Sequence, residues 1–507
     1  MTRTLETRAV HTESRAGLPP FATVPVLSIA AAGGLALLAT LGRYGYFGDE
    51  LYFLSAGRRL AVSYADQGPL LPALARLMDL LAPGSVVALR IPALLFTVAA
   101  IVLSAQIARE FGGSRGAQAL TAVAYATSPF LLVQGDQLAT NTIDTALWVL
   151  ISWLLIRWVR TRHDGLLLAA AAATALDMQV KWLIPFFWIA VGVGVLCFGP
   201  RELLRRPALW VGVIGVYLCT LPSLLWQARH GWPQLHMGAQ VAAEQDSSGG
   251  RALYVPLALV VAGVVGVPLL LAGIWALLRA PELRPYRFLG VVPVLVTVIF
   301  VITDGRPYYG AGCYGAVMAA GAVFAVRRMV GWRRWLAGGL VVASVFTVAV
   351  SLPWQPESTI EPAANEADAV AQLTVYGRFG WRELGEATAA AYAALPRDVR
   401  ANAVVIGDSY WQASSLDVDR RKYGLPAVYS PSRGFGYFGT PPDAATTVLW
   451  VGGDGTQPRT WCTDVTAVGR ADARLGIPGV TRDITLWRCD HPRAPWSREW
   501  SNMRHLG

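Results

Sequence analysis

Long apolar segments are the feature of this sequence that most limits its fold. The chain has about eleven of them, most near the roughly 20 apolar residues that a helix needs to cross the hydrocarbon core of a membrane. Inside a bilayer every backbone polar group needs an internal partner, so we expect these segments to be helices. The sequence therefore predicts an α-helical polytopic membrane protein. The segments are 21–41, 88–107, 116–133, 142–158, 165–180, 182–199, 207–226, 253–279, 287–303, 309–326 and 335–352.

Composition excludes an ordinary soluble protein. Charged residues make up 15% of the chain and hydrophobic residues 54%, whereas a typical soluble domain has about 25% charged residues. The net charge is +10, and nearly all of it is arginine, because the only lysines are Lys181 and Lys422. Most arginines stand in short clusters between apolar segments. We therefore expect the lipid bilayer as a partner and no nucleic acid.

The arginine clusters also predict the orientation of the chain, since cytoplasmic loops hold the excess of Lys and Arg. Every second connection carries arginines, and the short connections between them carry few. We predict a cytoplasmic N-terminus, a C-terminus outside, and a first span that is an uncleaved anchor. The predicted inside clusters are Arg3/Arg8/Arg15, Arg109/Arg115, Arg160/Arg162, Arg201/Arg205/Arg206, Arg279/Arg284/Arg287 and Arg327/Arg328/Arg333/Arg334.

A change of composition after Leu352 divides the chain. We predict a cytoplasmic tail at 1–20, a membrane domain at 21–352 with an outside loop at 42–87, and an extracytoplasmic α/β domain at 353–507. In the last domain, 381–395 is expected to be a helix, and 403–406, 447–451 and 484–487 to be buried strands. Cys462 and Cys489 both lie on the predicted oxidising side, which favours a disulfide between them.

Residues 434–439 match the pattern G-x-G-x-x-G. The run is followed by Thr440-Pro441-Pro442, which cannot open the helix that a dinucleotide-binding turn requires. We therefore expect no dinucleotide site there.

Acidic residues gather at the predicted outer boundary of the membrane. Asp49 and Glu50 follow the first span in an aromatic setting, Asp66 lies further along the same loop, and Asp136 and Asp144 flank the second outside turn. Burial in such a setting raises the pKa of a carboxyl group towards that of a general base. These side chains could act as a base or hold a divalent cation, Mg²⁺, Mn²⁺ or Zn²⁺. Any single one could instead be a solvated loop residue, and Asp144 could simply stabilise a helix N-terminus.

Basic residues near the same boundary are candidates for binding a phosphate. Lys181 falls in a short outside turn, Arg306 precedes a Pro-Tyr-Tyr run, and Arg90 lies just inside the second span. Ionisable residues within the membrane indicate function. Each of these three side chains could instead extend its charged end to the membrane–water interface. Polar and aromatic neighbours that could line the same substrate site are Tyr52, Gln67, Asn141, Tyr308 and Tyr309.

Several of these motifs together resemble a known class of enzyme. They are Asp49-Glu50, Asp66-Gln67-Gly68-Pro69-Leu70, Arg90-Ile91-Pro92-Ala93, Asn141-Thr142-Ile143-Asp144, the Lys181 turn and Gly305-Arg306-Pro307-Tyr308-Tyr309. The chain resembles the GT-C glycosyltransferases that use polyprenyl-phosphate sugars, in particular the protein O-mannosyltransferase and lipid A aminoarabinose transferase superfamily. The resemblance covers about residues 20–330.

The resemblance implies a GT-C-like fold and specific roles for the acidic residues. The catalytic base of such families carries over to Asp49, its motif partner to Glu50, and the aspartate of the second loop to Asp144. The families often have Lys or His just before the prolines, where this chain has Gln67 and Gly68. That departure gives the donor-phosphate contact to Lys181 or Arg306.

The function that we predict is an inverting transfer at the outer face of the cell membrane. Asp49 would deprotonate a hydroxyl of a protein, lipid or glycan acceptor, which attacks the anomeric carbon of a polyprenyl-phosphate-linked hexose or pentose. One alternative is a lipid or solute transporter, with ionisable residues near the bilayer midplane and an internal repeat. Another is a non-catalytic sensor or envelope-assembly protein. Replacing Asp49 separates the enzyme from both alternatives.

Overall fold

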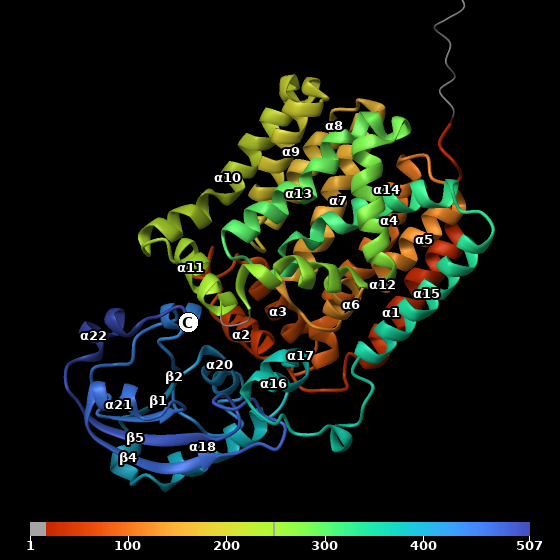
Figure 1. Cartoon of the computed structure of the whole chain (residues 1–507). Coiled ribbons are helices and arrows are strands. Elements are labelled where there is room, and N and C mark those ends of the chain that lie inside the picture. The colour runs from red at the N-terminus through yellow and green to blue at the C-terminus, as the bar shows by residue number, and fades with distance from the viewer. Residues whose placement is uncertain (1–16, 247–248) are drawn as a thin grey trace, which may run out of the picture.

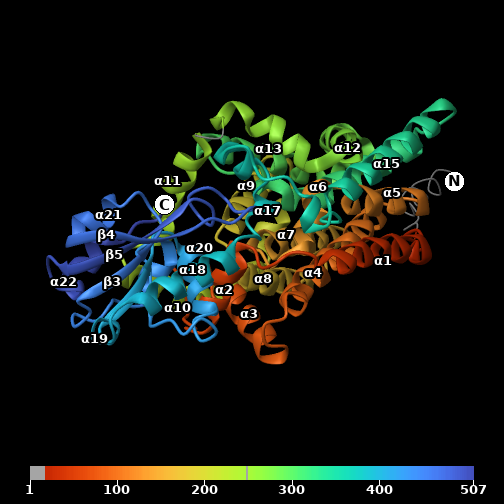
Figure 2. The ribbon, with the colours of Figure 1, turned by 90° about the horizontal axis from the view of Figure 1, so that it is seen from below.

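The computed structural model describes residues 17–246 and 249–507. It has two parts, a bundle of helices and a C-terminal unit built on a β-sheet (Figure 1). In Figure 2 the sheet lies at one end of the molecule and α15 reaches towards the other. The predicted inside cluster Arg3/Arg8/Arg15 lies outside the described residues.

Eight helices in the described part of the chain are long and apolar enough to cross a membrane, which confirms an α-helical polytopic membrane protein. Two of them begin with 3-10 turns, η3 (Pro281–Tyr286) and η4 (Pro307–Cys313). The eight are α1 (Thr23–Thr40), α4 (Val86–Glu110), α7 (Thr140–Thr161), α10 (Pro207–Arg229), α12 (Gly250–Arg279), α13 (Arg287–Ile302), α14 (Tyr314–Arg327) and α15 (Trp332–Ser351).

The other three predicted segments form shorter or bent helices, so the number of eleven spans stays a prediction. Two are α8 (Gly165–Asp177) and α9 (Ile184–Phe198). The segment 116–133 is broken into α5 (Arg115–Ala126) and α6 (Pro129–Val133), with a bend of 66°. Pro129 disfavours helical backbone at Ser128. The Ser128 hydroxyl instead accepts from the N–H of Leu131 and donates to the Val261 carbonyl at 2.7 Å.

The long connections outside the bundle contain helices of their own. The loop at 42–87 holds α2 (Gly48–Gly57) and α3 (Leu70–Leu81), and the connection after α10 holds α11 (Pro233–Asp246). A segment between the bundle and the sheet holds α16 (Glu366–Ala371) and α17 (Leu373–Tyr376).

The C-terminal unit contains a mixed five-stranded sheet in the order β2-β1-β3-β5-β4. β1 is parallel to β2 and β3, whereas β5 is antiparallel to β3 and β4. The strands are β1 (Ala403–Gly407), β2 (Val428–Tyr429), β3 (Thr447–Val451), β4 (Cys462–Ala471) and β5 (Ile484–Pro492). The helices around the sheet are α18 (Trp381–Ala394), α19 (Arg397–Arg400), α20 (Tyr410–Val418), α21 (Thr456–Trp461) and α22 (Trp496–Met503).

The three predicted strands and the predicted helix are confirmed. β4 was not expected, because most of its residues between the two ends are exposed and form no apolar run. The sulfur atoms of Cys462, at the start of β4, and Cys489, in β5, are bonded, as the sequence favoured.

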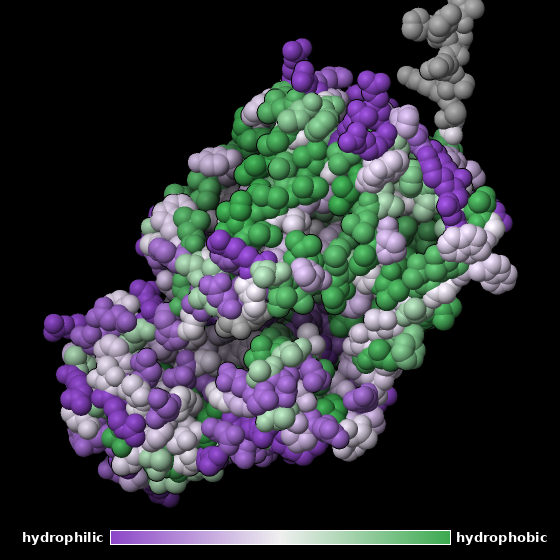
Figure 3. All heavy atoms as spheres, viewed as in Figure 1, coloured by the Kyte–Doolittle hydropathy of each residue, from purple (hydrophilic) through white to green (hydrophobic). Residues whose placement is uncertain are grey.

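The C-terminal unit is not an independent attachment, because it shares a hydrophobic core with the first loop. Tyr52 and Leu54 of α2 belong to the same buried cluster as Leu416 of α20 and Val405 of β1. In Figure 3 apolar side chains gather over the helical bundle and hydrophilic ones over the C-terminal unit, and the surface is hollowed between the two. The composition change after Leu352 therefore marks a real difference in surface chemistry.

Candidate functional site

Asp49 lies in the first turn of α2, and its carboxylate meets the C-terminal unit. Its Oδ1 accepts hydrogen bonds from the Tyr410 hydroxyl and the Trp411 indole N–H, both at 2.8 Å. Tyr410 and Trp411 open α20, which packs on α2. Asp49 is half-buried. The predicted base is therefore at the contact between the two parts of the molecule.

Glu50, the neighbour of Asp49, points to a different environment. It is fully buried, and its two oxygens accept from the Arg90 guanidinium at 2.9 and 2.8 Å and from the backbone N–H groups of Phe47 and Leu138 at 2.9 Å. Burial alone would raise the pKa of Glu50, but the charge and hydrogen bonds of Arg90 hold this pKa below its usual value. The expectation of a raised pKa is therefore wrong for Glu50, whose contacts are structural.

Asp66 lies in the loop between α2 and α3, close to Asp49. Its Oδ1 accepts from the Tyr52 hydroxyl at 2.8 Å, and the Tyr52 and Tyr410 rings pack edge to face at 5.3 Å. Burial raises the pKa of Asp66 to about 6, against the opposing effects of the Tyr52 hydrogen bond and the Arg433 charge. We therefore expect Asp66 to titrate near pH 6 instead of near pH 4.

The raised pKa of Asp66 predicts a pH-dependent stability. The folded protein binds this proton more tightly than the unfolded chain, so the stabilisation is complete below about pH 4 and is lost as the pH rises through about 6. Asp66→Asn is neutral at every pH. We expect its Tm to rise relative to wild type by about 2 °C or more between about pH 4.5 and 7.5, measured by thermal denaturation in detergent. Asp398→Asn, at an exposed carboxylate, should show no such trend, and a constant difference for Asp66→Asn would contradict the prediction.

Lys181 is brought to the same region by backbone pairing between two loops. The N–H of Gly68 donates to the Val180 carbonyl at 3.3 Å, which holds the Asp66 loop against the turn between α8 and α9. The Lys181 ammonium donates to the Asn141 side-chain oxygen at 2.8 Å and lies 4.2 Å from the Tyr309 ring centroid. Burial lowers the pKa of Lys181.

Two arginine side chains lie near Lys181 and Asp49. Arg306 and Arg433 both donate to the carboxylate of Glu244, which lies in α11. Arg433, in the 3-10 helix η6 (Arg433–Tyr437) of the C-terminal unit, also lies over the Tyr410 ring at 5.0 Å. Lys181 interacts electrostatically with Arg306 and Asp49, so the cations border one site.

Residues 434–439 cover part of this site. Gly434 approaches Tyr52 so closely that a Cβ there would lie 1.7 Å from the Tyr52 hydroxyl oxygen and 3.0 Å from Asp66. Phe438 stacks on the Tyr52 ring at 5.9 Å. The glycine is needed for close approach of backbone to this pair, not for a nucleotide.

The remaining predicted residues divide into two groups. Tyr308, Tyr309 and Asn141 surround Lys181, and Asp144 lies beside Asp177 and near Lys181. Gln67 is 2% exposed, and its side-chain amide finds no hydrogen-bond partner among the described residues. The second group, Arg90 and Asp136, is bonded to other residues and not to Lys181.

Arg90 and Asp136 are each held in a buried ion pair. Arg90 bonds Glu50 and the carbonyls of Leu41 and Gly45, at 2.6 and 2.8 Å, and is fully buried. Asp136 accepts from Arg378 at 2.7 Å. Neither residue contacts Lys181, Arg306 or Arg433 in the hydrogen bonds and ion pairs of the described residues. We therefore remove Arg90 from the candidates for binding a phosphate.

The acidic residues do not form a metal centre. Within residues 17–246 and 249–507, no group of three or more His, Cys, Asp or Glu side chains could hold a metal ion. The two carboxylates Asp49 and Asp66 are instead bonded to tyrosine and tryptophan donors. The divalent cation that the sequence raised therefore stays a prediction, and we derive no step through one.

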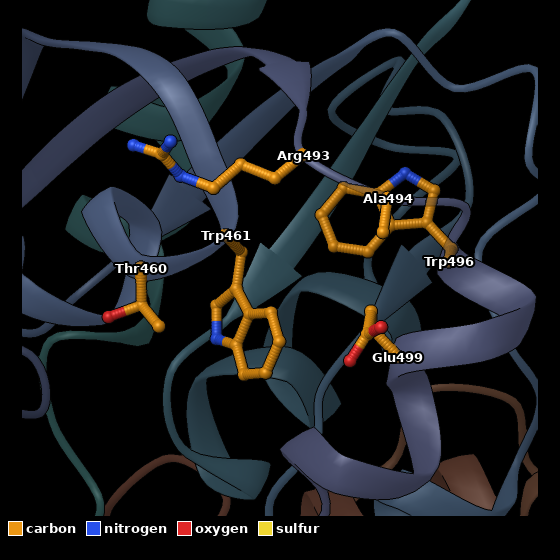
Figure 4. Close-up of a pocket in the computed structure, with 6 residues that line it drawn as sticks. All are labelled: Thr460, Trp461, Arg493, Ala494, Trp496 and Glu499. Carbon is orange, nitrogen blue, oxygen red and sulfur yellow. The ribbon is translucent and has the colours of Figure 1, made fainter.

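A separate cavity of about 150 Å³ lies in the C-terminal unit (Figure 4). Its lining is made of Thr460, Trp461, Arg493, Ala494, Trp496 and Glu499. None of these residues was predicted as a site residue, and none contacts Asp49.

Sequence reasoning missed four residues of the site, which are Tyr410, Trp411, Arg433 and Glu244. The G-x-G-x-x-G pattern begins directly after Arg433, but it does not indicate a contact with the first loop. The contacts to Asp49 join residues 361 and 362 positions apart, so no local pattern could have shown them.

The structure combines a bundle of long apolar helices, an acidic first loop and a C-terminal unit that contacts this loop. Residues 66–226 match the family model for dolichyl-phosphate-mannose-protein mannosyltransferase, about a third of the chain. A search of curated protein sequences finds no match.

Several solved structures have a similar fold. The chain is similar to ArnT from Cupriavidus metallidurans bound to undecaprenyl phosphate, with a TM-score of 0.62 and 15% identity over 92% of this chain and 98% of that one. The apo structure of ArnT gives a TM-score of 0.60 and 15% identity over 96% and 100%. The archaeal oligosaccharyltransferase AglB from Archaeoglobus fulgidus, with an inhibitory peptide and a dolichol phosphate, gives 0.48 and 13% over 78% and 64%. The two ArnT structures confirm the resemblance in fold that was predicted from the sequence.

Proposed function

We propose that this chain is a membrane glycosyltransferase that takes a sugar from a polyprenyl-phosphate donor. One observation supports this most strongly: the Asp49 carboxylate and the cations Lys181, Arg306 and Arg433 border one site in a fold like that of ArnT. A base and a set of phosphate-binding cations are the two parts that the transfer needs. The ArnT structure binds undecaprenyl phosphate, which makes that lipid the first donor carrier to test.

The proposed reaction is an inverting displacement. The free Oδ2 of Asp49 takes the proton from an acceptor hydroxyl, and the hydroxyl oxygen attacks the anomeric carbon as a new C–O bond forms. The bond between that carbon and the phosphate oxygen breaks, and the lipid phosphate leaves with the electron pair. Lys181, Arg306 and Arg433 stabilise the developing negative charge. The buried amide of Gln67, which has no partner among the described residues, is available to the sugar.

We further propose that the reaction takes place at the outer face, with the N-terminus inside and the C-terminal unit outside. Contacts gather several arginine clusters at one end of the bundle, where Arg327 reaches the Gly112 carbonyl and Glu282, and Arg160 pairs with Glu110. This gathering supports one positively charged, cytoplasmic side. We keep the domain limits 1–20, 21–352 and 353–507.

The test is a transfer assay with purified protein in lipid, radiolabelled undecaprenyl-phosphate sugars and a membrane extract as acceptor. We expect wild type to move label from one or more hexose or pentose donors to the acceptor. If a complete donor panel gave no transfer, while the protein moved lipid between leaflets, the transporter alternative would replace this proposal.

Lys181 provides a direct test of the donor-phosphate contact. Lys181→Ala removes a charge-assisted hydrogen bond to the phosphate, and we expect the donor KM to rise about 10- to 100-fold. The matched control is Lys422→Ala, at the only other lysine, which is largely exposed and pairs with Asp419. Equal donor KM values for the two variants would place the phosphate elsewhere.

A further inference from the structure

We propose that Tyr410 and Trp411 are positioning residues that hold the Asp49 carboxylate in one orientation, so that the C-terminal unit completes the catalytic site. This inference rests on the proposed function and deepens it. It gives the C-terminal unit a part in the chemical step.

The geometry at Asp49 is asymmetric. Both donors reach the same oxygen, Oδ1, at 2.8 Å, and no hydrogen bond to Oδ2 is found among the described residues. The terminal torsion of an aspartate is broad and roughly two-fold, so the carboxylate by itself has no fixed direction. Two donors on one oxygen select one direction and leave Oδ2 available to the acceptor hydroxyl.

The Trp411 indole is held by packing on the first loop. Its ring lies against Phe47, with centroids 5.0 Å apart, and next to Trp381 at 6.3 Å. A Cβ at Gly48 would lie 2.2 Å from the ring, so only glycine permits this contact. The indole can therefore donate to Asp49 in one orientation only.

The Tyr410 ring is held from two other sides. It packs edge to face on Tyr52 at 5.3 Å and lies under the Arg433 guanidinium at 5.0 Å. Ser409 caps the helix that Tyr410 opens, by accepting from the N–H of Gln412 at 3.3 Å. The start of α20 is thus a rigid support for both donors.

An ion pair fixes α20 on α2. Arg59 donates two hydrogen bonds to Asp417, at 2.7 and 2.8 Å, and Arg58 donates to the carbonyls of Asp417 and Val418 at 3.0 Å. A bidentate pair of this kind sets both distance and angle between two elements. The donors and Asp49 are therefore placed by one continuous set of contacts.

Tyr410→Phe deletes one donor and keeps its ring, and Trp411→Phe deletes the other donor and leaves a smaller aromatic ring in place of the indole. We expect each variant to lower kcat about 10- to 100-fold with an unchanged donor KM, and the double variant to lower it further. The pH dependence of kcat should also change in both variants, whereas a merely structural role would leave it as in wild type. Matched controls are Tyr392→Phe and Trp487→Phe, whose polar atoms donate to the carbonyls of Arg400 and Gly453.

The assay uses the full-length protein in lipid, with thermal denaturation of every variant to establish folding. A lowered kcat with wild-type donor KM and control-like Tm supports the inference. Wild-type kcat and pH dependence in both variants, beside an active wild type, would overturn the positioning role alone. Absence of transfer by wild type with every donor would overturn the proposed function and this inference with it.

Discussion

Asp49→Asn is expected to lower kcat for sugar transfer by about 10²- to 10⁴-fold, the range that a general base contributes. Asparagine keeps an oxygen that can accept from Tyr410 and Trp411 but cannot take a proton from the acceptor. The contacts at α2 and α20 are therefore retained, and the donor KM should stay near that of wild type. The measurement is steady-state transfer from the undecaprenyl-phosphate donor in lipid, with Tm as the test of folding.

The matched control is Asp79→Asn, which changes a carboxylate of the same loop. Asp79 lies in α3 and interacts only weakly with Arg76, at 3.8 Å. We expect wild-type kcat for this variant. An Asp49→Asn protein that folds and transfers sugar at the wild-type rate would exclude Asp49 as the base, and with it the mechanism above.

Breaking the buried pair of Glu50 and Arg90 should have the largest effect on stability. Arg90→Met leaves the Glu50 carboxylate buried without its charge partner and removes the bonds to the Leu41 and Gly45 carbonyls. Removing one member of a buried ion pair costs about 3–5 kcal/mol of unfolding free energy. We expect a loss of this size for Arg90→Met, measured by denaturant unfolding in detergent.

A double variant separates the loss of the ion pair from the cost of a buried charge without its partner. Glu50→Gln with Arg90→Met removes both charges, so it should recover part of the stability that Arg90→Met loses. Arg76→Ala, at the partly exposed pair with Asp79, is the control and should change stability by less than about 1 kcal/mol. A loss of that small size for Arg90→Met would show that the buried pair contributes little to the fold.

The two sets of variants assign separate roles to adjacent residues of one motif. Both Asp49 and Glu50 were predicted to be catalytic from the family resemblance, Asp49 as the base and Glu50 as its motif partner. Glu50 is inaccessible and bonded to α4, the N-terminus of α2 and Leu138, whereas Asp49 is half-buried and keeps one oxygen free of hydrogen bonds among the described residues. We therefore expect Glu50 to act on stability and Asp49 on rate.

Much of the fold could be predicted because it depends on local hydrophobicity. A segment of about 20 apolar residues must become a helix in a bilayer whatever surrounds it, so the segments at α1, α4, α7 and α12 were placed within a few residues. The buried strands β1 and β3 were recognised for the same reason. The exposed strand β4 was missed, because its position comes from pairing with β5 and not from its own sequence.

The sequence by itself determined a polytopic helical protein, an acidic first loop, and a lysine and an arginine at the boundary of the bundle. Only the tertiary structure decided that Tyr410, Trp411 and Arg433 meet that loop, and that Arg90 faces Glu50 instead of the proposed phosphate site. The physical reason is the separation along the chain of the residues that interact. Hydrophobic periodicity is read within a window of some tens of residues, whereas the bonds to Asp49 span more than 360 positions and exist only because α20 packs on α2.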